Sequence, residues 1–220
     1  MTLRFDTPDG PLDLAAARCI VAGWTGRDAR AVAHHIAELE ALGVPAPSRT
    51  PLPYIVSPAL LTQDDTIHCV GPHTSGEAEP AVLLTPRGRF LTLASDHTDR
   101  ALEAHSVALS KQVCAKPVAR TAWPIDAVSD LDALVLRSWV EEAGGWRLYQ
   151  DGTLAALRPI DEILAAVAAQ GGGDTVVLCG TLSAIGGVRP AARMRMELAD
   201  LAAGRTIALA YETRTLPANA

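Results

Sequence analysis

Alternation of apolar and polar residues predicts that much of this chain forms β-strands. Residues 80–84 and 89–93 flank the turn sequence PRG, which predicts a hairpin or two neighbouring strands. Downstream, two strands are expected on either side of a turn at residues 144–145, and the pair Asp151–Gly152 predicts a further turn. The segments DTVVLCG, ARMRMELAD and RTIALAYET then have the apolar runs or period-two patterns of strands.

Helical spacing of apolar residues appears in fewer places. Residues 25–42 begin with Thr-x-x-Asp, carry apolar residues three or four positions apart and are followed by Gly43, so they predict a capped helix. The segment PIDEILAAVAAQ predicts another helix, which ends before the glycines at 171–173. The run DRALEAHSVAL is also compatible with a helix. The balance predicts a strand-rich α+β protein with two or three helices.

Composition narrows the class of partner. A chain of 220 residues, of which 49% are apolar, is long enough for one large domain with its own core. The formal net charge of -6 argues against binding to nucleic acid or an anionic membrane, because both need clustered Lys and Arg. We therefore expect a small-molecule partner, with no nucleic acid and no membrane.

The cysteines and the apolar runs indicate the compartment. The four cysteines lie far apart, which argues against a zinc knuckle or a disulfide framework and predicts buried, reduced thiols. The sequence shows no basic segment leading into an apolar signal region, and no apolar run reaches the roughly 20 residues that span a bilayer. These features predict a cytoplasmic protein.

Three acids lie at positions where a metal could bind. Glu77 and Glu79 are separated by one residue just before an apolar run, between Gly76 and Pro80, and Asp96 follows the apolar strand FLTLA. Carboxylates are the ligands that Mg²⁺ and Mn²⁺ prefer. Taken alone, the first two acids also fit a solvated turn, and Asp96 also fits the N-cap of a following helix.

Two further places offer chemistry. His35 and Glu38 lie three residues apart in the predicted helix, so they would share a face and the carboxylate could orient the imidazole of a general base. The alternative is a solvated surface pair. The loop at residues 179–187, CGTLSAIGG, follows a strand, and its backbone amides could hold a carboxylate. It lacks both nucleotide-binding glycine motifs and also fits a structural turn.

In their order along the chain, these segments resemble the motifs of the fumarylacetoacetate hydrolase superfamily. The family opens with G-R-N-Y-x-x-H-x-x-E and continues with F-x-K-P-P-S-A-L-x-x-x-G-D-x-I; the chain has GRDARAVAHHIAEL and then YIVSPALLTQDDTIH. The family motifs E-x-E-L-A-V-V-I-G and N-D-V-T-x-R-D-L-Q are matched by EAEPAVLL and SDHTDRALE. The motif A-K-S-F-D-x-x-C-P resembles SKQVCAKP, and the later R-Q-D-G and T-G-T-P motifs resemble YQDG and LCGTL.

The match extends from about Gly26 to the C-terminal strands, with identifiable departures. Val56 or Ser57 stands where the family commonly has Lys, Pro80 replaces a Leu, and Leu182 replaces a Pro. The spacing from E-x-E to the following Asp is also shorter than usual. These departures predict a divergent bacterial branch of the superfamily, so the identity of the substrate is not carried over.

The resemblance implies a role for each matching residue. The metal ligands would be three carboxylates that hold Mg²⁺ or Mn²⁺, with Ca²⁺ as a further candidate: Glu77, Glu79 and Asp96. The catalytic side chains would be His35, Glu38 and Lys111, with Lys116 as the alternative lysine. The substrate-binding residues would be Arg100, Gly180 and Thr181.

The resemblance also implies a fold and an activity. The expected fold is a mixed β-roll with a short N-terminal lid helix, in a single domain whose residues 1–60 carry the lid and whose residues 61–220 form the catalytic core, usually as a homodimer. The implied activity is metal-dependent hydrolysis of a C–C bond in a 2-oxo acid such as an acylpyruvate or a fumarylacetoacetate-like compound. The alternative enzymatic activity is decarboxylation, hydration or isomerisation of a related 2-oxo acid. The non-enzymatic alternative is a catalytically silent protein that binds a small acid.

Overall fold

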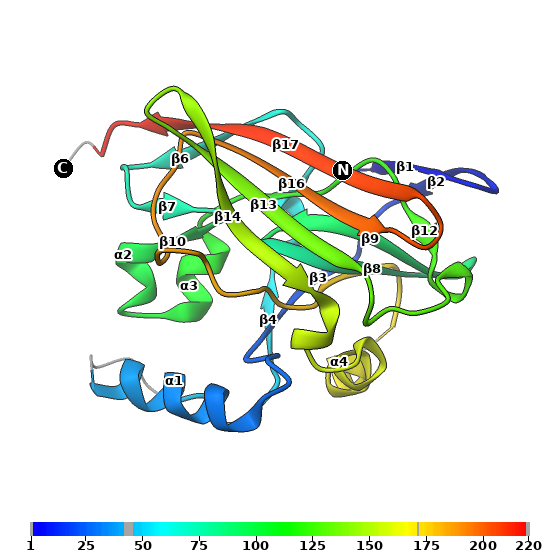
Figure 1. Cartoon of the computed structure of the whole chain (residues 1–220), viewed down its shortest axis with the longest axis horizontal. Helices are drawn as coiled ribbons and strands as arrows, with labels where there is room; N and C mark the ends of the chain where they lie inside the picture. The colour runs from blue at the N-terminus through cyan, green and yellow to red at the C-terminus, as the bar shows by residue number, and fades with distance from the viewer. Residues whose placement is uncertain (1, 42–45, 171, 219–220) are drawn as a thin grey trace.

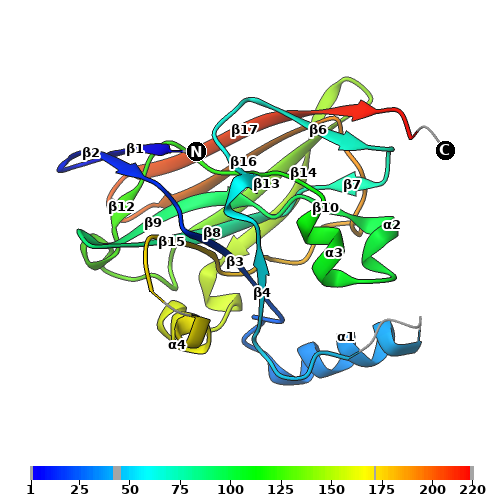
Figure 2. The same ribbon diagram turned by 180° about the vertical axis from the view of Figure 1, so that it is seen from behind.

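Two β-sheets form the body of the protein (Figures 1 and 2). The computed structural model describes residues 2–41, 46–170 and 172–218, with all of their side chains except those of residues 35, 38, 39 and 169. The first sheet has six strands, in the order β12 (Trp123–Pro124), β9 (Gly88–Ser95), β8 (Ala78–Thr85), β15 (Thr175–Leu178), β3 (Arg18–Gly23) and β4 (Leu52–Val56). The second has five, in the order β14 (Gly145–Thr153), β13 (Val135–Glu142), β16 (Arg193–Asp200), β17 (Arg205–Leu216) and β6 (Thr66–Val70).

Both sheets mix strand directions. The β15–β3 and β17–β6 pairs are parallel, whereas the other neighbours within these two sheets are antiparallel. Three two-stranded sheets complete the strand structure of the described residues: β1 (Leu3–Thr7) with β2 (Gly10–Leu14), β7 (Thr74–Ser75) with β10 (Thr98–Asp99), and β5 (Leu61–Thr62) with β11 (Lys116–Pro117). The strand-rich α+β class predicted from the sequence is therefore confirmed.

The six-stranded sheet is buried on both faces. On one face, residues such as Val82 and Leu93 share a core with Leu136 and Leu198 of the five-stranded sheet. On the other face, a second core includes Phe5 and its neighbours from the β1–β2 hairpin. Because both faces are covered, β8 and β9 contain long buried runs instead of a strict apolar–polar alternation.

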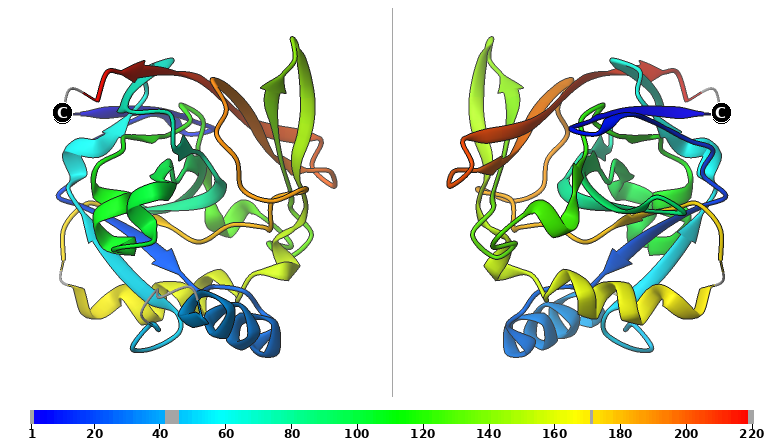
Figure 3. Two further views of the ribbon diagram at one scale, coloured as in Figure 1. Left: turned by 90° about the vertical axis from the view of Figure 1, so that its left-hand side faces the viewer. Right: turned by 90° about the vertical axis from the view of Figure 1, so that its right-hand side faces the viewer.

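The helices are short and lie around the sheets. They are α1 (Ala29–Ala41), α2 (Arg100–Glu103), α3 (Val107–Gln112) and α4 (Ile160–Val167), with 3₁₀ turns η1 (Pro58–Leu60), η2 (Ile125–Ala127), η3 (Leu154–Ala156) and η4 (Ala168–Gln170). Figure 3 shows α1 and α4 at one end of the molecule, away from β17. No helix among the described residues is long and apolar enough to cross a membrane.

The start of α1 differs from the prediction. The helix begins at Ala29, and Asp28 Oδ1 accepts hydrogen bonds from the amides of Arg30 (2.8 Å) and Ala31 (3.2 Å), so Asp28 provides the cap that was expected from Thr25. Thr25 lies before the helix, and its carbonyl accepts a 2.8 Å hydrogen bond from the amide of Arg158.

Most predicted strands are present, but one predicted turn is wrong. The hairpin of β8 and β9 and the pair β13–β14 are confirmed, and the latter turns at Ala143 and Gly144, both with positive φ. The turn predicted at Asp151–Gly152 does not form, because both residues continue β14 opposite β13. Asp151 also accepts a 2.7 Å hydrogen bond from Arg137 Nε across the pair.

Residues 1–60, which are expected to carry the lid helix of a single domain, also contribute strands to the main sheet. Strands β3 and β4 come from the first 60 residues, yet both pair within the six-stranded sheet. All four cysteines are buried and free, as predicted.

Substitution of a residue between the sheets tests this core. Leu136 in β13 is fully buried, so Leu136→Ala is expected to lower the free energy of unfolding by about 2 to 5 kcal/mol through lost contacts and a residual cavity. Leu201, which is 69% exposed, is the matched control, and Leu201→Ala is expected to change stability by less than about 0.5 kcal/mol. Urea unfolding measures both; equal losses would contradict the assignment of the core.

Candidate active site

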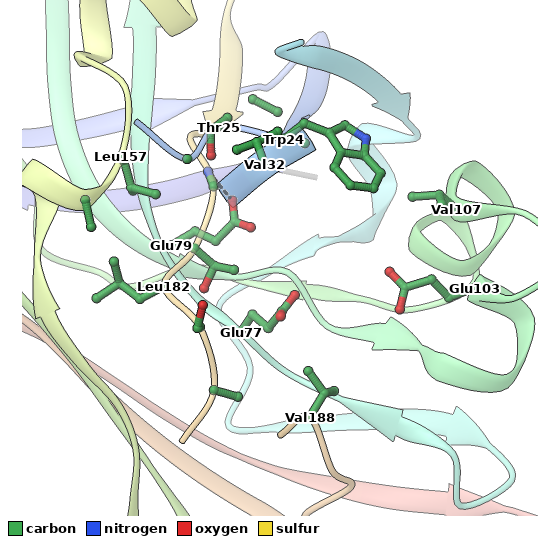
Figure 4. Close-up of a pocket in the computed structure, with 18 of the residues that line it drawn as sticks. Trp24, Thr25, Val32, Glu77, Glu79, Glu103, Val107, Leu157, Leu182 and Val188 are labelled. Carbon is green, nitrogen blue, oxygen red and sulfur yellow. Dashed lines mark hydrogen bonds between the residues drawn. The ribbon is translucent and has the colours of Figure 1, made fainter. Parts of the chain in front are cut away.

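A cavity of about 720 Å³ lies beside the start of β8. Its walls come from the end of β3, from α1, from α2 and α3, and from the loop at residues 180–188 (Figure 4). Segments from both ends of the sequence therefore surround one space. The cavity contains most, but not all, of the residues that the sequence singled out.

Glu77 and Glu79 both line this cavity. Glu77 immediately precedes β8 and Glu79 is its second residue, and side chains two positions apart on extended chain point to the same side. Glu79 is only 3% exposed and accepts a 2.8 Å hydrogen bond from the amide of Gly180. Burial and the nearby charge of Asp96 raise the pKa of Glu79 well above its usual value. This carboxylate therefore favours a cation or a proton beside it.

Asp96 lies next to these acids but beneath the surface of the cavity. It follows β9, it is fully buried, and its amide donates a 3.0 Å hydrogen bond to the carbonyl of Glu77. Its carboxylate forms an ion pair with Lys111, and Lys116 Nζ lies 3.2 Å from Asp96 Oδ1. Burial alone would raise its pKa, but the two lysines outweigh burial and hold the pKa of Asp96 below its usual range.

Asp96 is not a helix cap. Asp99 Oδ1 instead accepts 3.0 Å hydrogen bonds from the amides of Ala101 and Leu102 at the start of α2. Asp96 Oδ1 accepts no hydrogen bond from the described residues. The helix-cap alternative for Asp96 is therefore wrong, and its buried charge is instead matched by the two lysines.

The two candidate lysines differ in their access to the cavity. Lys111 lines it, and the carboxylates of Asp96, Glu77 and Glu79 outweigh the effect of burial and raise the pKa of its ammonium. Lys116 is fully buried and donates to the carbonyls of His97 (2.5 Å) and Lys111 (2.6 Å).

Arg100 also lines the cavity, where it is already paired with acids. Its Nη2 lies 3.0 Å from Glu77 Oε2, its Nη1 donates a 2.9 Å hydrogen bond to Glu103, and its Nε donates a 2.7 Å hydrogen bond to Ser75 Oγ. These two acids outweigh burial and raise the pKa of Arg100. The guanidinium thus orients Glu77 at the edge of the carboxylate cluster.

The glycine-rich loop is tied to both sheets. Gly180 has a φ of +96°, and a Cβ there would lie 1.7 Å from Thr25 Oγ1, so only glycine fits without a shift of the backbone or of Thr25. Thr181 Oγ1 donates a 2.7 Å hydrogen bond to the carbonyl of Ala78 and accepts one of 2.6 Å from Gln150 Nε2. The hydroxyl proton of Thr181 is therefore already committed to the start of β8.

His35 and Glu38 are located only as positions of α1, because their side chains lie outside the described part of the structure. Two other residues of this helix, Ala31 and Val32, line the cavity. The helix thus borders the carboxylate-containing space, and the role of its His and Glu stays a prediction.

The donor set fits a hard divalent cation in its chemistry. Among residues 2–41, 46–170 and 172–218, no three His, Cys, Asp or Glu side chains are gathered closely enough to form a metal site. However, Glu77 and Glu79 face one cavity, and Asp96 Oδ1 lies beside them in an ion pair with Lys116 at 3.2 Å. Oxygen donors of this kind suit Mg²⁺, Mn²⁺ or Ca²⁺.

Three residues of the site lacked a strong sequence signal. Gln150 is fully buried and accepts from the amide of Ala78 (2.9 Å) while it donates to Thr181 and to the carbonyl of Leu182 (2.8 Å). Trp24 lines the cavity and donates a 3.1 Å hydrogen bond to Tyr54, which also lines it. The YQDG match marked the segment of Gln150, but nothing in the apolar pattern distinguished Trp24 or Tyr54 from core residues.

Comparison with known proteins identifies the family. Residues 22–211 match the model of a family described as "Protein of unknown function (DUF2848)". No curated protein matches the sequence closely enough to count as a relative.

Several solved structures share the fold. A 2-keto-3-deoxy-D-arabinonate dehydratase complexed with magnesium and 2,5-dioxopentanoate has a TM-score of 0.64 at 14% identity, covering 92% of this chain and 74% of that one. A 5-carboxymethyl-2-hydroxymuconate delta-isomerase from Mycobacterium smegmatis has a TM-score of 0.63 at 16% identity, covering 100% of both chains. A maleylpyruvate hydrolase from Sphingobium sp. SYK-6 has a TM-score of 0.61 at 16% identity, covering 91% of this chain and 72% of that one.

At these identities the likeness establishes the fold. The dehydratase, the isomerase and the hydrolase thus share the fold of this chain. The chain itself belongs to the DUF2848 family.

Proposed function

We propose that this protein is a divalent-metal-dependent enzyme that hydrolyses a C–C bond in a small 2-oxo acid. One observation carries the proposal: Glu77, Glu79 and the ammonium of Lys111 face a single cavity, with Asp96 buried directly behind them. Buried groups with shifted pKa values that gather in a cavity are typical of catalytic sites. The magnesium-bound dehydratase, the isomerase and the hydrolase of similar fold support this class of reaction.

Glu77, Glu79 and Asp96 would hold the metal, for which Mg²⁺ and Mn²⁺ are the first candidates and Ca²⁺ a further one. When bound, such a cation supplies Lewis acidity to the carboxylate and keto oxygens of a 2-oxo acid. Lys111 would then exchange part of its contact with Asp96 for the negative charge of the substrate. Its place in the cavity favours Lys111 over Lys116 for this role, because Lys116 is fully buried and held by two backbone carbonyls.

Substrate contacts are proposed for Arg100, Gly180 and Thr181, all of which line the cavity. Arg100 would act mainly by holding Glu77 in place, since its guanidinium is already shared between Glu77 and Glu103. The hydroxyl of Thr181 would donate its proton to the substrate carboxylate only after giving up its bond to the carbonyl of Ala78. The positive φ of Gly180 fixes the path of this loop beside Glu79.

His35 would be the general base and Glu38 the residue that orients it, on a helix that acts as a lid. His35 would take a proton from water, and the resulting hydroxide oxygen would bond to the distal carbonyl carbon of an acylpyruvate. The adjacent C–C bond then breaks, and its electron pair forms the enolate of the 2-oxo acid. Lys111 would stabilise this enolate where its charge develops.

Two alternatives remain distinct from this reaction. A decarboxylase, hydratase or isomerase would use the same acids and Lys111, and the dehydratase and the isomerase of similar fold support this alternative. A catalytically silent small-acid-binding protein would have no reason to bury Glu79, Asp96 and Lys111 together.

A homodimeric state and a cytoplasmic location stay predictions from the sequence.

A substrate panel tests the proposed function directly. Acylpyruvates, fumarylacetoacetate-like acids and oxaloacetate are incubated with the purified protein and Mg²⁺ or Mn²⁺, and products are followed by chromatography. Metal-dependent cleavage of an acylpyruvate is the expected result. Metal-dependent decarboxylation, hydration or isomerisation would replace the hydrolase by the alternative reaction, and no metal-dependent turnover of any 2-oxo acid would refute the enzyme.

Asp96→Asn tests the metal ligands without relying on activity. The substitution removes one negative charge, so Mn²⁺ affinity measured by calorimetry is expected to fall by on the order of tenfold or more. Asp99→Asn is the matched control, because Asn caps a helix as well as Asp does and Asp99 does not line the cavity. Equal Mn²⁺ affinity in both variants and the original protein would remove Asp96 from the metal site.

His35→Ala tests the base. Turnover of an acylpyruvate is expected to fall by on the order of a hundredfold or more, with unchanged Mn²⁺ affinity, because a positioned base contributes this much to the rate. Glu38→Gln is expected to lose less, and His34→Ala on the same helix is the control. If His35→Ala keeps most of its activity on oxaloacetate but not on the acylpyruvate, the base serves hydrolysis alone; full activity on both would exclude His35.

A further inference from the structure

The cavity is larger than a three- or four-carbon acid requires. Its volume of about 720 Å³ lies within the roughly 300–1,000 Å³ of pockets that enclose drug-sized ligands. Glu77, Glu79 and Lys111 occupy one part of it. Under the proposed function, the carboxylate and keto oxygens of the substrate account for that part only, so the remaining space would hold the rest of the substrate.

Large apolar side chains from three distant segments line the remaining space (Figure 4). We call this set the apolar wall: Trp24, Val32, Leu157 and Leu182. Figure 4 shows these four side chains in the same pocket as Glu79 of β8 and Glu77, which precedes this strand. Leu157 and Leu182 are 3% and 7% exposed and belong to the core between the sheets, so this side of the wall is fixed by the packing of the protein.

The described lining of the cavity offers no unpaired cation that could bind a second carboxylate of the substrate. Within the described lining the cations are Arg100 and Lys111, and both are paired, Arg100 with Glu77 and Glu103 and Lys111 with Asp96. The other ionisable side chains of the described lining are acidic. A carboxylate at the far end of a substrate would meet either apolar side chains or like charges, and both cost free energy.

We propose that the substrate is a 2-oxo acid whose carbon chain ends in an uncharged, apolar tail that lies against the apolar wall. This inference rests on the proposed function, which places the 2-oxo acid group at the carboxylates. It separates the protein from enzymes that act on 2-oxo dicarboxylates, because a terminal carboxylate needs a cation where this cavity has apolar side chains. Val32 is the residue of the wall that can change this preference without disturbing the core, since it lies on α1 and is only partly buried.

Binding measurements on a series of 2-oxo acids, which do not depend on turnover, test the proposal. Calorimetry with Mn²⁺ present compares the straight-chain acids from pyruvate to 2-oxooctanoate, and 2-oxohexanoate is paired with 2-oxoadipate, which has the same six carbons but a terminal carboxylate. Each added methylene is expected to tighten binding by about fourfold, which corresponds to burial of one CH₂ group. We expect 2-oxoadipate to bind at least about tenfold more weakly than 2-oxohexanoate. Equal or tighter binding of 2-oxoadipate would overturn the inference.

A charge placed in the apolar wall should reverse the preference. In Val32→Lys the new ammonium is expected to weaken the binding of 2-oxohexanoate and to strengthen the binding of 2-oxoadipate. The ratio of the two dissociation constants should then shift by tenfold or more. Ala37→Lys is the matched control, because it adds the same charge to an exposed position of the same helix outside the cavity lining. An equal shift in both variants would show a general charge effect and refute the role of the wall.

Two controls, binding of hexanoate and binding to the metal-free protein, distinguish a failure of this inference from a failure of the proposed function on which it rests. If hexanoate binds as tightly as 2-oxohexanoate with Mn²⁺, or if Mn²⁺ has no effect, the proposed function fails even where affinity still rises with chain length. If 2-oxo acids bind only with Mn²⁺ but 2-oxoadipate is preferred, the proposed function stands and the apolar tail is wrong. Absence of binding by every acid in the series would refute both.

Discussion

The ion pairs of Asp96 with Lys111 and Lys116 are the interaction on which the arrangement of the site depends. All three side chains are buried, and a buried carboxylate that loses its cations carries a large desolvation cost. Lys116 also donates to the carbonyls of His97 and Lys111, so it joins the chain after β9 to the last turn of α3. This contact fixes Lys111 beside the cavity, and with it the balance of charge around Glu77 and Glu79.

The buried sheet explains why the acids are found at this place. Strands β8 and β9 are covered on both faces, so carboxylates in their middle would have no access to a ligand. At their paired ends the cavity opens, and the bond from the amide of Asp96 to the carbonyl of Glu77 holds the two chain segments together. Gln150 of the other sheet completes the arrangement by bonding to Ala78 and Thr181. The carboxylates are thus positioned by backbone that both sheets support.

The sequence predicted the strands and the motif acids better than it predicted their environment. Apolar patterning identified β8, β9, β13 and β15 to β17, because burial on one or both faces leaves a local signal. It could not show that Arg137 would bond to Asp151 within a strand pair, or that the carbonyl of Thr25 would bond to the amide of Arg158 and the cap of α1 would come from Asp28. These outcomes depend on residues far away in the chain, as do the pairing of Asp96 with two lysines and the position of Trp24 in the cavity.

The charge of the cluster connects the proposed reaction with the proposed substrate. Asp96 is paired with Lys111 and Lys116, Arg100 is shared between Glu77 and Glu103, and Glu79 accepts a hydrogen bond from the amide of Gly180. A divalent metal would add two positive charges, and a 2-oxo acid with an apolar tail would return only one negative charge. A second negative charge appears on the substrate as the enolate forms, and the positive charge of the metal and of Lys111 would stabilise it. Interactions that are stronger at that stage than with the bound substrate lower the barrier, whereas contacts between an apolar tail and the apolar wall stabilise both stages equally and act on binding.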